Sequence, residues 1–267
     1  MQVINLGPLS IDASLLFSLL ALMVMFLAAG YLEKKQKIKI EGRLWLIVLL
    51  AVMVGRMVFV GQFWSHYQGS WLAMLNVRDG GFNWQAAVLT AAIALGLWLF
   101  NKPLLRTAAL GSVAAGLAVF LIGFGTLHIV QPSQAITLPK VELRTLNQEP
   151  VALTQYGGKP VVLNLWASWC PPCRREMPVL QAAQQQHPDV HFVFANQAES
   201  VQVVQDYLDA AGLTLDNVLL DSQTEIADFV QSRGLPTTLF IDAEGQMQSY
   251  RVGELSAASL ASHLRAF

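Results

Sequence analysis

The chain has 267 residues, of which 54% are hydrophobic and only 13% are charged, compared with about 25% charged residues in typical soluble domains. Residues 1–130 carry nine Lys or Arg and four Asp or Glu, whereas residues 131–267 carry eight and fourteen, for a net charge of −1. The absence of a basic stripe in the second half argues against a nucleic-acid partner. A basic, apolar half followed by an acidic half of ordinary composition predicts two domains, over residues 1–133 and 134–267, in different surroundings.

Four apolar runs occupy the first half, and each approaches the roughly 20 residues that cross a hydrocarbon core. They cover residues 11–31, 44–63, 84–100 and 107–130. Buried core helices of a large soluble domain are the alternative, but the length of the runs and their few charges favour membrane spans. We therefore predict an α-helical membrane domain with four spans.

The basic residues of the short loops predict how these spans are oriented. The first loop carries Lys34, Lys35, Lys37, Lys39 and Arg43, the third carries Lys102 and Arg106, and the second carries only Arg78, beside Asp79. The first and third loops should therefore lie in the cytoplasm. A cleaved signal peptide is not expected, because no Lys or Arg precedes the first run and a lysine cluster follows it. The N-terminus and the second domain then lie on the periplasmic side of a bacterial inner membrane, where disulfides can form.

The second half reads as alternating strands and helices. Residues 131–160 predict a tether followed by a small β-hairpin region. Strands are expected at residues 161–166, 190–195, 217–220, 237–242 and 247–252, and helices at 171–186, 201–211, 224–232 and 256–266. This order predicts an α/β domain around one sheet. Pro178 lies inside the first of these helices and should kink it.

The only two cysteines, Cys170 and Cys173, lie in the stretch WASWCPPCRREMP. A zinc site needs about four ligands, and no second cysteine pair accompanies them. A structural disulfide would close a very small loop and remove little entropy from the unfolded chain. A redox pair has a mechanism, because the N-terminus of the expected helix stabilises a thiolate. Cys170 is then the exposed attacking thiolate and Cys173 the buried resolving thiol, the two forming a Cys170–Cys173 disulfide when oxidised. Trp166 and Trp169 are expected to shield the pair from water.

The segment WCPPC, preceded by VVLNLWAS and followed by RREMP, resembles the thioredoxin-fold disulfide reductases of the TlpA and ResA type. A second match, Gly234-Leu235-Pro236-Thr237-Thr238 followed by LFIDAEG, lies downstream, and the resemblance covers about residues 136–267. It implies a thioredoxin-like domain with a cis peptide before Pro236, beside the disulfide. Leu235 would offer backbone hydrogen bonds to an incoming substrate, which would also contact Trp169. The alternative is a trans proline that opens a strand.

Two more positions match this family. Asn164 stands where thioredoxin has a buried Asp, so a buried proton acceptor is missing there. Glu176 matches an active-site Glu of ResA-like proteins, and it is expected to take or supply protons during thiol exchange. The alternative is that Glu176 only interacts favourably with the dipole of its helix.

The first half carries a different resemblance. GPLSID near the N-terminus, Gly55-Arg56 and Arg78-Asp79-Gly80-Gly81 resemble the first part of prolipoprotein diacylglyceryl transferase, over about residues 5–125. That family continues with a His-Gly-Gly segment where this chain has FNWQA, so transferase activity is not expected. An ionisable residue inside a span marks a functional site. Arg56 and Asp79 are therefore predicted to contact a lipid or a partner, the alternatives being an ion pair between them or snorkelling of Arg56.

No cysteine lies in any apolar run, so the chain cannot carry electrons across a membrane as proteins of the DsbD or CcdA type do. A separate transmembrane donor of that type is expected to reduce the pair. The sequence thus predicts a membrane-bound periplasmic thiol-disulfide oxidoreductase, without metal or cofactor, that reduces exported proteins with cysteine pairs. The alternatives are a disulfide oxidase or isomerase, and a lipid-binding membrane module whose thioredoxin-like domain senses redox state.

Overall fold

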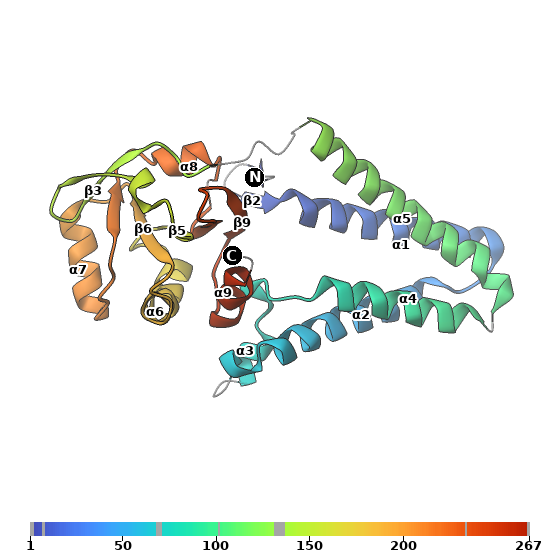
Figure 1. Ribbon diagram of the computed structural model, residues 1–267. Helices are drawn as coiled ribbons and strands as arrows, with labels where there is room; N and C mark the ends of the chain where they lie inside the picture. Colours follow the sequence, from blue (N-terminus) through green and yellow to red (C-terminus); the bar gives the residue numbers. More distant parts are fainter. Residues whose placement is uncertain are drawn as a thin grey trace.

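The computed structural model describes residues 3–6, 9–67, 71–100, 102–130, 137–232 and 234–265. A helical region comes first and an α/β region follows, and Figure 1 shows that they meet beside the last helix of the chain. The predicted domain boundary between residues 133 and 134 lies outside the described residues.

The helical region begins with a feature that the sequence analysis did not predict. Strands β1 (Val3–Leu6) and β2 (Leu9–Asp12) form an antiparallel hairpin directly before the first helix. The helices that follow are α1 (Ala13–Gln36), α2 (Glu41–Gln62), η1 (Trp64–Tyr67), α3 (Trp71–Leu75), η2 (Val77–Asp79), α4 (Trp84–Phe100) and α5 (Pro103–Val130). The apolar run at residues 11–31 therefore contains the end of a strand and most of a helix. Periodicity does not distinguish a strand from a helix in short apolar runs.

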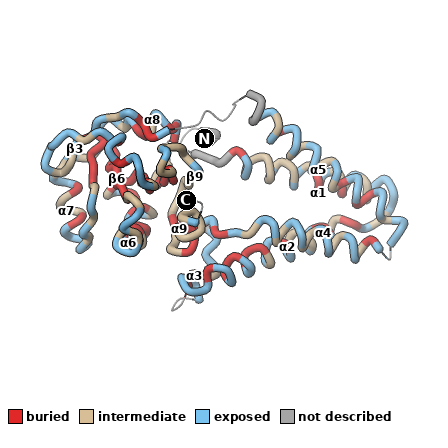
Figure 2. Tube along the Cα trace, viewed as in Figure 1, coloured by how far each residue is buried: buried red, intermediate tan, exposed pale blue. Residues whose placement is uncertain are grey.

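Three helices among the described residues are long and apolar enough to cross a membrane: Ala13–Gln36, Glu41–Gln62 and Pro103–Thr126. The prediction of four spans is not confirmed, because α4 has 17 residues. Such a helix rises about 26 Å, against a hydrocarbon core of about 30 Å. The most apolar windows of the three longer helices are only 17%, 28% and 28% buried, and Figure 2 shows exposed residues along each of them. Exposed apolar helices of this length allow anchoring in a membrane.

The four longer helices associate in pairs, with α1 along α5 and α2 along α4 (Figure 1). The pairs meet through a buried apolar cluster in which Ile40 and Leu44 approach Ala108, with Trp98 packed against them. The two basic loops, which precede α2 and α5, therefore lie at the same end of the helical region. This end is remote from the α/β region (Figure 1).

The α/β region is built on a seven-stranded sheet with the order β4-β3-β7-β6-β5-β8-β9. The strands are β3 (Glu142–Thr145), β4 (Pro150–Ala152), β5 (Val161–Trp166), β6 (His191–Gln197), β7 (Val218–Asp221), β8 (Thr237–Ile241) and β9 (Met247–Val252). The helices are η3 (Leu153–Tyr156), α6 (Pro171–Gln186), α7 (Val201–Ala211), α8 (Glu225–Phe229) and α9 (Ala257–Leu264). The strands β5, β6 and β7 run parallel, and the outer strands pair antiparallel.

Strand β5 shows why this region forms a sandwich. All six of its residues are buried, and successive strand side chains point to opposite faces of a sheet. Val162 packs in the cluster that contains residues of α6, α7 and α9, whereas Leu163 packs in the cluster that contains residues of α8. A strand that is apolar at nearly every position is thus covered on both faces. The α/β architecture confirms the prediction, and the predicted bounds of β5 and α6 agree with the structure.

Candidate redox site

The two cysteines lie where β5 hands over to α6, and they form a disulfide. The Cys170–Cys173 bond has an S–S length of 2.02 Å and joins Cα atoms 5.3 Å apart. Cys170 is the N-cap residue of α6, and its Sγ accepts a hydrogen bond from the Cys173 backbone N–H at 3.3 Å. A cap position places the sulfur against the N–H groups that a helix leaves without intrahelical partners. These groups would stabilise a thiolate on Cys170 after reduction.

The burial of the pair differs from the expectation at Cys170. Cys170 was expected to be exposed but is only 2% exposed. Cys173 was expected to be buried and is 0% exposed. Trp166 is buried in the same apolar cluster as the cysteines, but Trp169 is 68% exposed. Trp169 precedes the helix on a loop. Trp166 therefore helps to shield the pair, and shielding by Trp169 stays a prediction.

Glu176 is a fully buried carboxyl group one turn after Cys173. Its Oε1 accepts a hydrogen bond from Asn164 Nδ2 at 2.8 Å, and its Oε2 accepts one from the Leu255 backbone N–H at 2.8 Å. Burial raises the pKa of Glu176 to about 8, and the two hydrogen bonds oppose this shift. A group with such a pKa exchanges protons near neutral pH.

Asn164 joins this carboxyl group to the neighbouring strand. The Asn164 amide also donates to Thr238 Oγ1 at 2.9 Å, and the two residues are register partners in β5 and β8. The sequence suggested that a buried proton acceptor is missing at residue 164. The structure shows that the carboxyl group of Glu176 is hydrogen bonded to that position.

The peptide between Leu235 and Pro236 is cis, as the resemblance implied. Pro236 comes directly before β8, which pairs with β5, the strand that leads to Cys170. The Pro236 carbonyl accepts from the Gly253 N–H at 2.8 Å, and the Thr237 hydroxyl donates to the Gly234 carbonyl at 2.7 Å. Leu235 is half-buried and packs against both core clusters.

A further network near the cysteines was not predicted. The Glu199 carboxylate accepts from the backbone N–H and the hydroxyl of Ser168, at 2.7 and 2.5 Å, and from Asn196 Nδ2 at 2.7 Å. Ser168 lies in the loop between β5 and Cys170. Because the carboxyl ends of parallel strands meet at one edge of a sheet, the position of Glu199 just after β6 was a usable signal.

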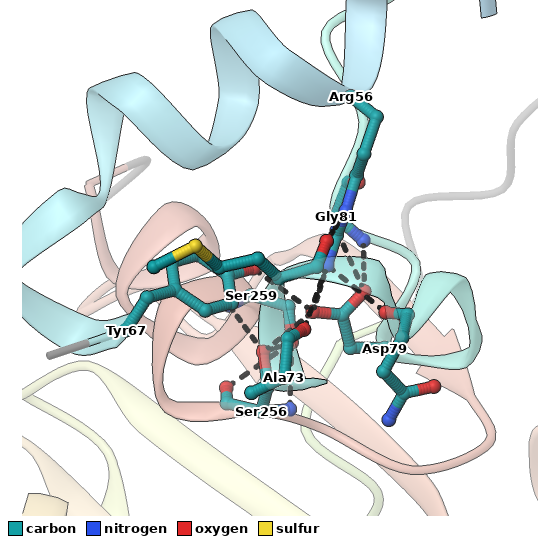
Figure 3. A network of polar contacts seen from close by, with 9 residues as sticks. Arg56, Tyr67, Ala73, Asp79, Gly81, Ser256 and Ser259 are labelled. Carbon is teal, nitrogen blue, oxygen red and sulfur yellow. Dashed lines mark hydrogen bonds and ion pairs between the residues drawn. The ribbon is translucent and has the colours of Figure 1, made fainter. Parts of the chain in front are cut away.

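Arg56 and Asp79 form an ion pair in the helical region. Arg56 Nη1 lies 2.9 Å from Asp79 Oδ1, and both side chains are buried. Arg56 also donates to the backbone carbonyls of Met74, Gly81, Ala73 and Asn76. Figure 3 shows the cluster, in which Asp79 also accepts from the hydroxyls of Tyr67 and Ser256. The sequence left three arrangements open for Arg56: contact with a lipid or partner, an ion pair with Asp79, and snorkelling. The structure shows the ion pair.

Comparisons with known proteins place the α/β region in a family. A profile of the AhpC/TSA family matches residues 135–250. An uncharacterized protein of Haemophilus influenzae is 33% identical over 150 residues, which are 54% of this chain and 94% of that one. Thiol-disulfide oxidoreductase ResA of Geobacillus thermodenitrificans is 32% identical over 130 residues, 48% of this chain and 74% of that one. The crystal structure of StoA from Bacillus subtilis covers 47% of this chain and 99% of that one, at 28% identity and a TM-score of 0.41.

The matched residues 135–250 contain both cysteines, Glu176 and Pro236, and residues 1–134 lie outside the family profile. The resemblance of the helical region to the transferase therefore stays a prediction. The similarity to ResA covers 74% of that protein, and the residues matched by the family profile include the disulfide at the N-terminus of α6. The α/β region belongs to the thioredoxin-like AhpC/TSA family, and the chain is a thiol-disulfide oxidoreductase of the ResA and StoA type.

Proposed function

We propose that this oxidoreductase is a membrane-bound reductase that opens disulfides of exported proteins on the periplasmic side of a bacterial inner membrane. The observation that carries the direction is the burial of both cysteines, at 2% and 0% exposed, in an apolar cluster. Apolar burial disfavours a thiolate and opposes the stabilisation that the N-terminus of α6 gives to Cys170, whereas a strongly oxidising pair depends on a stabilised reduced form. Arg174 and Arg175 follow the pair. Arg174 contacts the Tyr207 ring and Arg175 pairs with Glu254, rather than with a cysteine thiolate.

The reaction transfers two electrons from the enzyme to the substrate. The Cys170 thiolate attacks one sulfur of a substrate disulfide, forms a mixed disulfide and releases the first substrate thiolate. Cys173 then loses its proton and attacks Cys170 Sγ, which forms the Cys170–Cys173 disulfide and releases the second substrate thiolate. The enzyme dithiol is oxidised, the substrate disulfide is reduced, and the released thiolates take up protons according to their pKa values.

Glu176 is the group that we assign to proton handling at Cys173. It is buried on the same helix one turn further on, and its pKa of about 8 allows both protonation states near neutral pH. A carboxylate form accepts the proton when Cys173 becomes the attacking thiolate. When a donor reduces the disulfide, the protonated form of Glu176 returns this proton to Cys173.

The substrate is expected to dock around the exposed Trp169. This indole is 68% exposed immediately before Cys170, and exposed aromatic side chains of this size often anchor protein contacts. The half-buried Leu235 precedes the cis proline and would offer its backbone to an extended segment of the substrate.

The helical region would hold this site at the membrane surface. We assign spans to α1, α2 and α5, and also to α4, because its loop to α5 lies beside the loop from α1 to α2. The two basic loops at that common end favour a cytoplasmic location. The α/β region and the N-terminus then face the periplasm, and the site and its substrates are in an oxidising compartment.

The electrons would come from another protein. The chain has only two cysteines, both in the α/β region, so no thiol pair lies in the helical region. A separate transmembrane donor of the DsbD or CcdA type would therefore reduce the Cys170–Cys173 disulfide.

A trapping experiment tests this function. In Cys173→Ser, the mixed disulfide with a substrate cannot resolve, so exported proteins should accumulate on the full-length enzyme in cells. The matched control Cys170→Ser lacks the attacking thiolate and should trap none. Equal trapping by both variants would contradict the assigned roles, and absence of any cysteine-dependent adduct would contradict the choice of exported proteins as substrates.

A further inference from the structure

The Asp79-Gly80-Gly81 motif spans the end of η2 and the start of the loop to α4, and the proposed redox reaction does not use it. Asp79 is 3% exposed and lies at the centre of the Arg56 cluster (Figure 3). Its Oδ2 accepts from Ser256 Oγ at 3.0 Å, although the two residues are 177 positions apart. Ser256 is the N-cap residue of α9 in the α/β region. The motif of the helical region thus touches the α/β region directly.

The two glycines of the motif are required by the closeness of this contact. Gly80 has a φ of +70°, and a Cβ atom there would lie 2.2 Å from the Arg251 guanidinium. A Cβ at Gly81 would lie 2.2 Å from the Phe59 ring and 2.7 Å from Arg56 Nη1. Any other residue would push Arg251 or the Arg56 cluster away. Gly80 therefore allows the loop to pack against Arg251 of the α/β region, and Gly81 allows it to pack against Arg56 of the ion pair.

Apolar and aromatic contacts surround the polar ones. Ala258 of α9 is buried in a cluster with Phe59, Phe63 and Tyr67 from the end of α2 and from η1. The Arg265 guanidinium lies 4.4 Å from the centroid of the Phe63 ring. Burial, followed by the effect of the Asp79 carboxylate, raises the pKa of Tyr67 to about 12, so its hydroxyl remains a donor to Asp79. The contact has the buried core of an interface.

The segment that is held in this way also supports the redox site. Leu255, next to Ser256, donates its N–H to Glu176 Oε2 at 2.8 Å. The charged groups that act on Glu176 come from the same segment, namely Glu254, which pairs with Arg175, and Arg251, which lies against Gly80. From β5, the neutral Asn164 amide faces the carboxyl group. Residues 251–256 therefore contact the membrane region on one side and Glu176 on the other.

We propose that the Arg56–Asp79 cluster is a docking site for residues 251–265 of the chain's own α/β region, and that docking positions the Leu255 N–H on Glu176. Asp79 and Ser256 are then positioning residues for the redox reaction. The inference rests on the proposed role of Glu176. It links the membrane region, which the family profile does not cover, to the chemistry at the cysteines.

The same contacts argue against a lipid headgroup as the ligand of Arg56. Arginine has five N–H donors, and here they meet Asp79 and four backbone carbonyls at 2.6–3.3 Å. A phosphate would have to displace these partners from a buried position. An anionic lipid at Arg56 is accordingly an outcome of the test below and not part of the proposal.

A pair of variants at Ser256 separates docking from helix capping. Asp and Asn both cap helices well, and they have the same size. The side-chain amide in Ser256→Asn would still donate to Asp79, whereas Ser256→Asp would place a second carboxylate against it. In the full-length protein in nanodiscs, Ser256→Asp should speed amide exchange of residues 251–260 roughly tenfold or more, because a charge-assisted contact is lost. Ser256→Asn should match the wild type, and so should the exposed control Asp206→Asn.

The second measurement reads the redox site. The pH dependence of Cys170 alkylation in the reduced protein should shift in Ser256→Asp and stay unchanged in Ser256→Asn. Equal exchange in the two variants would overturn docking, and faster exchange with an unchanged alkylation profile would overturn the link to Glu176. Loss of protection when phosphatidylglycerol replaces phosphatidylcholine would make Arg56 a lipid site and overturn the proposal. Exchange reports docking whichever direction the enzyme works in, so a failure of the proposed function would be recognised separately.

Discussion

At the scale of single residues, Glu176 is a carboxyl group with no exposed surface, held between the Leu255 N–H and the Asn164 amide. Burial favours its neutral form. The resemblance identified Glu176 as an active-site residue, but its contact with Asn164 could not be predicted. The two residues are 12 positions apart, and they meet only because α6 packs across β5.

The pH dependence of stability should follow from Glu176. Its pKa rises from an ordinary value of 4.5 to about 8 on folding. The stability linked to this group is complete below pH 4.5 and is lost as the pH rises through about 8, by about 1.4 kcal/mol per pH unit in between. Thermal unfolding of the oxidised full-length protein in detergent, followed by tryptophan fluorescence between pH 5 and 8, measures this.

Glu176→Gln should flatten that dependence, because glutamine does not titrate. The exposed Glu149→Gln is the matched control and should keep the slope of the wild type. A Glu176→Gln protein whose unfolding midpoint still falls with pH as in the wild type would show that another group is responsible.

At the scale of elements, the strand β5 and the helix α6 could be predicted from the sequence to the residue. The run VVLNLW is apolar, and Pro171 directly follows the cysteine that caps the helix. The hairpin β1–β2 was less accessible, because periodicity does not separate strands from helices in short apolar runs. The helix α4 has the bounds expected for the apolar run at residues 84–100, and only its assignment as a membrane span is not confirmed. The loop between β5 and α6 is held by Glu199, which belongs to a different part of the sequence.

Removing the charge of Glu199 should loosen this loop. Glu199→Gln weakens the contacts to Ser168 and Asn196, each a hydrogen bond to a charged group worth about 1.5–3 kcal/mol. The Ser168 amide should therefore exchange with solvent roughly tenfold faster or more, as measured by hydrogen exchange. Glu244→Gln, on the exposed turn after β8, should leave this amide unchanged. An unaltered Ser168 amide in Glu199→Gln would mean that the backbone alone holds the loop.

At the scale of the whole molecule, an apolar helical region and an oxidoreductase region meet through α9. Composition and charge predicted the two regions, and the family resemblance predicted the fold of the second. Their contact was beyond the sequence, since Asp79 and Ser256 are 177 positions apart and the local pattern around each residue does not indicate the other. In physical terms, local propensity and periodicity describe elements, whereas docking depends on the shape of two folded surfaces.

The central claim is that the buried Cys170–Cys173 pair donates electrons to its substrates. The most direct test is the equilibrium reduction potential of the full-length protein, measured in glutathione buffers by the ratio of dithiol to disulfide. Since the apolar burial of both sulfurs opposes the stabilisation of the thiolate by the helix N-terminus, we predict a value well below about −180 mV. A value of about −120 mV, typical of a strong oxidant, would contradict the reductase assignment and favour an oxidase.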